Sequence, residues 1–465
     1  MILRLFQDSA RFSRSRDDSR TTEKGVNSAA QLTLSILEKI TEGIALKSLN
    51  IRLWDGTYWP SRAPRPATLV LNRPSALREM LEHGSQLEVA EAYLHEAFDI
   101  EGDMIDAFEL EELLAAQTKD WTRTLSVAAM LRGLPAFKEK KEVSATRAAR
   151  LNGKVHSRPR DQNAIQFHYD VSNDFYALWL DPRMVYSCAY FDNSAASLEQ
   201  AQRRKLDLIC RKLNLQPGER LLDIGSGWGG LLIHAATEYG VKADGITLSE
   251  KQLRWTQHLI EQNGLKDRVT VRLADYRELE REEVYDKAVS VGMVEHVGRD
   301  KLGVYFQQVS GLLKRGGLFL NHGIGRGPVP WTNKAENFID RYVFPDSDLV
   351  PLPLMLEAAA EAGLEIRDVE SMREHYALTL RHWVRRLEER KEEARRHVDE
   401  ATYRIWRLYM AGSSHNFDLG YLSIYQTLLG KLTPDGKTQA TATRKAWYVD
   451  HDGSDNHAER PSFSL

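Results

Sequence analysis

The chain has 465 residues, too many for one ordinary hydrophobic core, so its length predicts at least two domains. A hydrophobic content of 42% and a charged content of 28% are typical of globular proteins and exclude a collagen-like, coiled-coil or wholly disordered chain. The 63 lysines and arginines nearly balance the 66 aspartates and glutamates; the formal net charge of −3 gives no general attraction to nucleic acid or anionic lipid.

The ends of the chain and its cysteines bear on where the protein works. Residues 1–6 are mostly apolar, but polar residues follow at once, so a signal peptide's longer apolar region is missing. No stretch approaches the roughly 18 consecutive apolar residues that span a bilayer, so we expect any membrane contact to be peripheral. The two cysteines, Cys188 and Cys210, are too few for a disulfide framework and fit a reducing compartment. We therefore expect a cytoplasmic protein.

The first part of the chain predicts a small α+β domain over residues 29–131. Residues 1–28 are polar and lack periodicity, which predicts a disordered tail, and residues 433–465 predict a second, equally polar tail. Within the domain, β-branched and apolar runs predict two strands, and helical spacing predicts two helices. The strands are expected at 49–54 and 67–71, and the helices at 75–83 and 87–98.

A basic segment, residues 132–163, follows this domain. Between Arg132 and Arg160 it holds nine lysines and arginines and only two glutamates, a local net charge of +7. Two interpretations stay open: a solvated linker, or a segment attracted to anionic lipid headgroups or phosphates.

Strands and helices alternate in the next domain, residues 164–432. This pattern predicts an α/β fold with a doubly wound, mainly parallel, Rossmann-like sheet. The expected strands are 220–224, 243–248, 269–273, 285–291 and 317–322, and the expected helices are 230–239, 250–263 and 301–314.

A glycine-rich run, Leu221-Leu222-Asp223-Ile224-Gly225-Ser226-Gly227-Trp228-Gly229-Gly230, joins the first of these strands to the first helix. Glycines at such a turn let the backbone approach a ligand closely, as in nucleotide-binding folds. A dinucleotide site requires an acidic residue at the end of the second strand, where this chain has Thr247. Asp275 and Tyr276, after the third strand, instead suit S-adenosylmethionine, with Asp275 accepting from the adenine amine and Tyr276 packing on the ring. The pattern favours a methyltransferase over a dehydrogenase.

Five separated motifs carry a resemblance to a known family. They are Phe167-His168-Tyr169-Asp170-Val171-Ser172-Asn173-Asp174-Phe175-Tyr176, Tyr186-Ser187-Cys188-Ala189-Tyr190-Phe191, Ile246-Thr247-Leu248-Ser249-Glu250-Lys251-Gln252, Glu295-His296-Val297-Gly298 and Tyr342-Val343-Phe344-Pro345. With them the chain resembles the cyclopropane-fatty-acyl-phospholipid synthase family over about residues 164–430. The amino-terminal domain resembles the family only by its position ahead of the catalytic part.

The resemblance implies a reaction on lipid. Members of this family use S-adenosylmethionine to add a methylene across a cis double bond of an unsaturated phospholipid acyl chain. An alkene is a weak nucleophile, so the site must hold the sulfonium methyl against it in a dry pocket, and a base must then remove a proton so that the ring closes. The resemblance implies that this base is a bicarbonate ion held by Cys188, Glu295, His322 and Tyr376 and by the backbone of Ile324.

The resemblance also implies a set of residues around the cofactor, and no metal. They are Tyr169 and Ser187 near the methionine carboxylate, Gly225 and Gly227 beneath it, Thr247 and Gln252 at the ribose, and Asp275 and Tyr276 around adenine. Taken singly, Cys188, His322 and Tyr376 are as typical of core packing as of catalysis. Only their conjunction favours a catalytic site.

Two further features bear on the lipid. Aromatic residues recur around the motifs, and some are expected to line an acyl tunnel and steady a cation: Tyr176, Trp179, Tyr190, Phe191, Tyr305, Phe306, Tyr342 and Phe344. Residues 382–407 show helical spacing and predict one amphipathic helix. This helix is expected to pack on the catalytic domain, with two alternatives open: that it lies on a bilayer or forms a subunit contact.

The expected partner is an unsaturated phospholipid in a membrane, with the protein associated peripherally with the inner face. The resemblance implies that the amino-terminal domain helps to dock the membrane or the second subunit of a homodimer. Alternative functions stay open: a lipid methyltransferase giving a methyl- or methylene-branched chain, a small-molecule N-methyltransferase, and a non-catalytic lipid-binding module.

Overall fold

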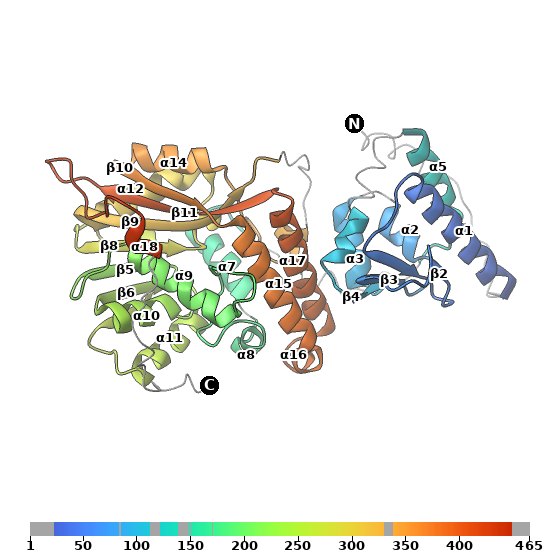
Figure 1. Cartoon of the computed structure of the whole chain (residues 1–465), viewed down its shortest axis with the longest axis horizontal. Helices are drawn as coiled ribbons and strands as arrows, with labels where there is room; N and C mark the ends of the chain where they lie inside the picture. The colour runs from blue at the N-terminus through green and yellow to red at the C-terminus, as the bar shows by residue number, and fades with distance from the viewer. Residues whose placement is uncertain are drawn as a thin grey trace.

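The computed structural model describes residues 23–82, 85–111, 121–137, 148–149, 151–169, 171–329 and 338–448. Two domains lie side by side, the smaller amino-terminal one next to helices α15 (Arg373–Glu389) and α17 (Glu400–Asp418) of the larger (Figure 1). Residues 138–147 and 150 of the predicted basic segment, and the outer parts of both predicted tails, fall outside the described residues. Within the described ranges, no helix combines the length and the apolar character needed to cross a bilayer.

The amino-terminal domain is a four-stranded sheet in the order β2-β1-β3-β4, flanked by helices. Its elements are α1 (Glu23–Thr41), β1 (Leu49–Arg52), β2 (Tyr58–Trp59), β3 (Ala67–Leu71), α2 (Ala76–Leu81), α3 (Gln86–Leu94), β4 (Phe98–Gly102) and α5 (Trp121–Leu131). The predicted α+β character is confirmed. Two boundaries are wrong: the helix expected to reach residue 98 ends at Leu94 and is followed by strand β4, and α1 begins inside the predicted tail.

The larger domain is built on a seven-stranded sheet in the order β10-β11-β9-β8-β5-β6-β7. The strands are β5 (Arg220–Ile224), β6 (Lys242–Thr247), β7 (Val269–Leu273), β8 (Tyr285–Val291), β9 (Leu313–Arg326), β10 (Leu364–Ser371) and β11 (Leu422–Lys431). Neighbouring strands are parallel in the part of the sheet that runs β7-β6-β5-β8-β9, and β11 is antiparallel to both of its neighbours, β9 and β10. The predicted doubly wound, mainly parallel sheet is confirmed.

Alternation along the strands buries both faces of this sheet. Leu221 packs with α9 (Leu198–Lys212), α10 (Gly230–Tyr239) and α11 (Glu250–Gln262) on one face. The next residue, Leu222, packs with α12 (Leu302–Leu312) and α14 (Leu352–Glu361) on the other. Because successive side chains of a strand point to opposite faces, a continuous apolar strand requires helices on both sides.

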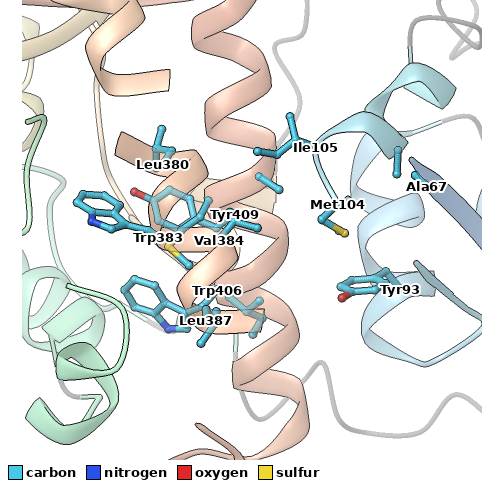
Figure 2. Close-up of a cluster of buried hydrophobic side chains, with 14 of the residues drawn as sticks. Ala67, Tyr93, Met104, Ile105, Leu380, Trp383, Val384, Leu387, Trp406 and Tyr409 are labelled. Atoms are coloured by element: carbon cyan, nitrogen blue, oxygen red, sulfur yellow. The ribbon is translucent and has the colours of Figure 1, made fainter. Parts of the chain in front are cut away.

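The expected single helix over 382–407 is instead three helices, because the chain turns at Arg390 and again at Val398 and Asp399. They are α15, α16 (Lys391–His397) and α17. Their apolar sides are buried, which confirms packing on the catalytic domain. Figure 2 shows Trp383 and Trp406 in this layer, with Tyr93 and Met104 of the amino-terminal domain across from it.

The predicted tail from residue 433 is wrong in its first half. Trp447, in α18 (Lys445–Tyr448), is only 5% exposed and packs with α9. The Tyr448 hydroxyl donates to the Glu370 carboxylate at 3.0 Å. A tryptophan and a tyrosine in an otherwise polar stretch are the signal for this contact.

Candidate active site

The glycine-rich turn leaves strand β5 with its backbone in the left-handed region. Gly225 has φ of +82° and Gly227 has φ of +55°, conformations that glycine adopts without a steric penalty. The N–H groups of Gly225 and Ser226 both donate to the Ile246 carbonyl, at 3.0 and 2.9 Å, and so fix the turn to β6. A Cβ added at Gly227 would meet no atom within 4 Å, so open space lies against the backbone there.

That open space belongs to a pocket at the carboxyl ends of β5, β6, β7 and β8, covered by α7 (Arg158–Tyr169). Seven of the eight residues predicted to bind the cofactor line it: Tyr169, Gly225, Gly227, Thr247, Gln252, Asp275 and Tyr276. The eighth, Ser187, lies outside this lining. Met293 and His296 line it too, and burial lowers the pKa of His296 to about 4, so its ring is neutral.

The ribose and adenine sides of the pocket are held by short polar contacts. Thr247 Oγ1 donates to Gln252 Oε1 at 2.8 Å, which leaves the amide N–H groups of Gln252 available to a ligand. The Asp275 carboxylate accepts from the backbone N–H and guanidinium of Arg277, at 2.5–2.9 Å. Tyr276 is 6% exposed, and its ring packs edge-on against Tyr305. The pocket has a glycine cradle and acidic and aromatic groups of the kinds that fit an adenosyl group.

Beside this pocket, Glu295 follows β8 and is fully enclosed. Its Oε1 accepts from the Ile324 backbone N–H at 2.7 Å, whereas its Oε2 has no partner among the described residues. Burial raises the pKa of Glu295 to about 7, against an ordinary value of 4.5, although the Ile324 N–H opposes the shift. Glu295 can therefore hold or release a proton near neutral pH.

His322 lies on β9, opposite Gln426 of β11. In the assigned amide orientation, Gln426 Nε2 donates to His322 Nδ1 at 3.3 Å, which leaves the proton on Nε2. Nε2 is buried and has no partner among the described residues. Burial, together with the charges of Lys205 and Lys212, lowers the pKa of His322, so the ring is neutral and offers one N–H.

Cys188 and Tyr376 complete the predicted set. Burial raises the pKa of the Cys188 thiol, which lies 3.2 Å from the Ala189 carbonyl and remains protonated. Burial raises the pKa of Tyr376 well above its ordinary value, and the charges of Tyr409, Cys188 and Glu295 add to the rise. The Cys188 thiol lies 3.7 Å from the Met372 carbonyl, and the Tyr376 backbone N–H donates to the same carbonyl at 3.0 Å, so these two residues lie together. The unpartnered Glu295 Oε2 and His322 Nε2–H are groups that a small hydrogen-bonding anion such as bicarbonate fits.

An aromatic cluster lies around this region, and the sequence identified only part of it. Tyr176, Trp179 and Phe344 were expected there and do belong to it. Tyr176 and Trp179 pack with Tyr186 and Trp406, and Phe344 stacks on His168, which packs with the same two rings. The other five predicted rings lie elsewhere: Tyr305 and Phe306 behind the sheet, Tyr342 against Glu91 of α3, and Tyr190 and Phe191 against His375 and His382.

Two residues that sequence reasoning missed lie close to the predicted set. The hydroxyl groups of Tyr186 and Tyr409 are 3.3 Å apart, and burial raises the pKa of Tyr409 to about 12, with Glu295 adding to the rise. Tyr409 lies on α17, more than 200 residues from Tyr186, so no local pattern marks it. Lys205, on α9, is the other; its Nζ donates to Ser187 Oγ at 2.8 Å.

Known proteins are similar to this chain in sequence and in fold. Residues 156–427 match the family model of mycolic acid cyclopropane synthetase. A probable fatty acid methyltransferase of Pseudomonas putida is 40% identical over 404 residues, 86% of this chain and 96% of the relative. The structure of the cyclopropane synthase MmaA2 from Mycobacterium tuberculosis matches with a TM-score of 0.56 and 34% identity, over 58% of this chain and 98% of its own. Mycolic acid cyclopropane synthase CmaA1, complexed with SAH and CTAB, matches with a TM-score of 0.54 and 32% identity, over 58% and 97%.

Proposed function

This chain belongs to the mycolic acid cyclopropane synthetase family, and on that premise we propose that it adds a methylene from S-adenosylmethionine across a cis double bond of an unsaturated phospholipid acyl chain, forming a cyclopropane ring. Membership makes it an S-adenosylmethionine-dependent lipid methyltransferase. The phospholipid substrate and the ring product are the proposal.

One observation supports it: Glu295 and His322 lie beside the lining of the glycine-turn pocket, Glu295 between Met293 and His296 in the chain and His322 opposite Val291 on the neighbouring strand. Methyl transfer to an alkene leaves a carbocation, and closing the ring from it requires a base beside the reacting carbon to remove a proton from the added methyl group. Glu295 Oε2 and His322 Nε2 are buried and unpartnered among the described residues, and Cys188 and Tyr376 lie with them. Buried polar groups are normally hydrogen-bonded, so this pair supports a bound anion there.

The chain's residues have separable roles in this proposal. The cofactor supplies an electrophilic methyl group, and bicarbonate supplies a base. Gly225 and Gly227 bring the backbone against the cofactor, and Tyr169 with the aromatic cluster excludes water. Glu295 holds or accepts a proton at Oε2, since its pKa of about 7 places both forms near neutral pH. His322 donates from Nε2 and orients an acceptor.

The surroundings support a lipid substrate. The aromatic cluster between the sheet and α17 offers apolar surface to an acyl chain and ring faces to a developing cation. The amino-terminal domain covers the outer side of α17 and adds a surface that methyl transfer itself does not require. We propose that this domain serves contact with the inner face of a membrane or with a second subunit of a homodimer.

A branched product is the second candidate, because the Pseudomonas putida relative carries the description fatty acid methyltransferase. Product analysis separates the two. Purified protein is incubated with S-adenosylmethionine carrying a labelled methyl group, bicarbonate and vesicles of monounsaturated phospholipid, and the acyl chains are examined by mass spectrometry and proton NMR. A mass gain of one methylene with loss of the olefinic protons supports cyclopropanation.

Other outcomes of the same assay would redirect the proposal. A gain of one methylene with an olefinic signal retained would indicate a methylene-branched chain. Label appearing only on an amine supplied in a parallel reaction would indicate an N-methyltransferase. Binding of lipid without label transfer would indicate a lipid-binding module.

A further inference from the structure

Among the described residues of the larger domain, three lysines are fully buried, and one of these lacks a carboxylate partner there. Lys212 pairs with Glu370, and Lys287 lies 3.7 Å from Glu219. Lys205 is 1% exposed and has no ion pair within 4 Å among the residues described. Its recorded hydrogen bond is the one from Nζ to Ser187 Oγ, at 2.8 Å. A buried ammonium without a counter-ion is costly, so this position calls for an explanation.

The direction of that hydrogen bond leaves the hydroxyl hydrogen of Ser187, a partly buried residue, available to another acceptor. An ammonium can only donate, so Ser187 Oγ accepts from Lys205 and its own hydrogen is free to point elsewhere. No acceptor for that hydrogen lies among the described residues. The segment is held from the same helix, because Gln202 Nε2 donates to the Ser187 carbonyl at 2.8 Å. Helix α9 therefore fixes Ser187 with a hydroxyl hydrogen directed away from Lys205.

The nearest carboxylates compensate the Lys205 charge only in part. Burial lowers the pKa of Lys205 to about 8, and the charges of Cys188, Asp181 and Asp223 act against this fall. Burial also raises the pKa of Asp223 to about 7, so near neutral pH its charge is incomplete. The Asp181 carboxylate accepts from the backbone N–H groups of Val185 and Arg183. Lys205 is thus mostly protonated at pH 7, and the carboxylates around it do not fully balance its positive charge.

We propose that Lys205 is a positioning residue for the cofactor, anchoring the carboxylate of its methionine moiety through the Ser187 hydroxyl. Ser187 lies outside the lining of the glycine-turn pocket, but the neighbouring Tyr186 packs on Tyr169, which lines it. Lys205 sets the direction of the Ser187 hydrogen bond and supplies the positive charge that a carboxylate needs. This proposal depends on the proposed function in one respect only, namely that the cofactor is S-adenosylmethionine. A hydrogen bond to a charged group is about twice as strong as a neutral one, which makes the carboxylate a better acceptor here than a neutral group.

The experiment measures the affinity of two ligands by calorimetry. One is S-adenosylhomocysteine, and the other is its decarboxylated analogue, which differs only in lacking the carboxylate. Lys205→Met, nearly isosteric and uncharged, is expected to lose about 10- to 100-fold in affinity for S-adenosylhomocysteine. Its affinity for the decarboxylated analogue should change less than threefold. Lys212→Met, which removes a buried ammonium about two turns further along α9, where Lys212 pairs with Glu370, is the matched control and should not alter the ratio of the two affinities.

Further variants keep the test decisive. Lys205→Gln retains a donor without the charge and is expected to lose less than Lys205→Met; it also serves if Lys205→Met fails to fold by circular dichroism. In a double-mutant cycle with Ser187→Ala, the two losses for S-adenosylhomocysteine should not add, because the residues act as one unit.

Three results would overturn the anchor. An equal loss for both ligands would make Lys205 a structural residue, and an unchanged affinity for S-adenosylhomocysteine would remove it from cofactor binding. Unchanged affinities combined with a higher bicarbonate requirement for turnover would assign the ammonium to the bicarbonate instead. Failure of the wild-type protein to bind either ligand is a different result, because it would refute the cofactor itself.

Discussion

The backbone N–H of Ile324 donates to Glu295 Oε1 at 2.7 Å, across the carboxyl ends of two neighbouring strands. This bond fixes the carboxyl group so that Oε2 remains the free oxygen. The bond opposes the effect of burial on the pKa of Glu295, yet burial dominates and raises that pKa to about 7. The carboxyl is thereby oriented and able to change protonation state at physiological pH.

Replacement of Glu295 by glutamine should separate binding from turnover. The amide keeps the shape of the carboxyl and can still accept from Ile324, but it cannot take a proton. We expect Glu295→Gln to bind S-adenosylhomocysteine within threefold of wild type and to lose about 10²- to 10⁴-fold in turnover. Glu374→Gln, at an exposed carboxylate of α15, is the control. Wild-type turnover in Glu295→Gln would exclude Glu295 from the chemistry.

The same variant tests the raised pKa through stability. Between pH 4.5 and about 7 the native protein retains a proton on Glu295 that the unfolded chain releases, so wild-type stability falls as pH rises through this window. The unfolding free energy of wild type minus that of Glu295→Gln should fall by roughly 3 kcal/mol across it and then stay level. Asp223, whose pKa is also raised to about 7, is present in both proteins and cancels. Denaturant titrations at several pH values provide the measurement; a flat difference would contradict it.

A side chain at Gly227 should block the cofactor. Its φ of +55° costs an L-residue about 1–2 kcal/mol, and the added methyl would enter the pocket. We expect Gly227→Ala to bind S-adenosylhomocysteine at least tenfold more weakly. Gly264→Ala matches it, since Gly264 has φ of +65° and open space but lies outside the pocket. Gly264→Ala should lose similar stability and no affinity; equal affinity losses in both variants would point to backbone strain alone.

Arg407 should be a major contributor to the contact between the domains. Its guanidinium donates to Glu388 Oε1 at 2.7 Å, to the Tyr93 hydroxyl at 3.1 Å and to the Ile100 carbonyl at 3.1 Å. The side chain is 8% exposed, so Arg407→Met leaves buried partners unsatisfied and should lower the unfolding free energy by about 3 kcal/mol.

Arg395 supplies the comparison for that variant. It pairs with Glu392 and Glu400 but is 35% exposed, so Arg395→Met should cost less than about 1 kcal/mol. Denaturant unfolding followed by tryptophan fluorescence measures both variants. Similar losses would show that the buried contacts of Arg407 do not stabilise the contact between the domains.

The parts of the fold that follow from local sequence were predicted well. Strand β5 and helix α10 have the predicted bounds, because an apolar strand, glycine turn and helix start are adjacent in the chain. Strands β10 and β11 were not predicted, since β11 pairs antiparallel with β9 across about 100 residues and β10 in turn pairs with β11. The expected helix over 382–407 is broken at Arg390 and Val398, where neither proline nor glycine marks the turn.

The residues of the candidate site also divide into those that local motifs predict and those that only tertiary contacts bring there. Residues inside contiguous motifs, such as Gly225 and Thr247, line the predicted pocket. Lys205 and Tyr409 lie on helices whose spacing indicates only core packing, and their polar ends meet the site through tertiary contacts. A lysine at a buried helix position is a signal that sequence analysis could use, since such a residue needs a partner. The partner itself, Ser187, could be identified only in three dimensions.

Helix α17 carries Arg407 and Tyr409 two positions apart. Arg407 reaches out to the amino-terminal domain, and Tyr409 reaches in to the hydroxyl of Tyr186. Helix α17 therefore contacts both the amino-terminal domain and the candidate site. A shift of the amino-terminal domain that moves this helix would displace the Tyr409 side chain. Truncation or redesign of the small domain would alter the enzyme's chemistry as well as its outer surface.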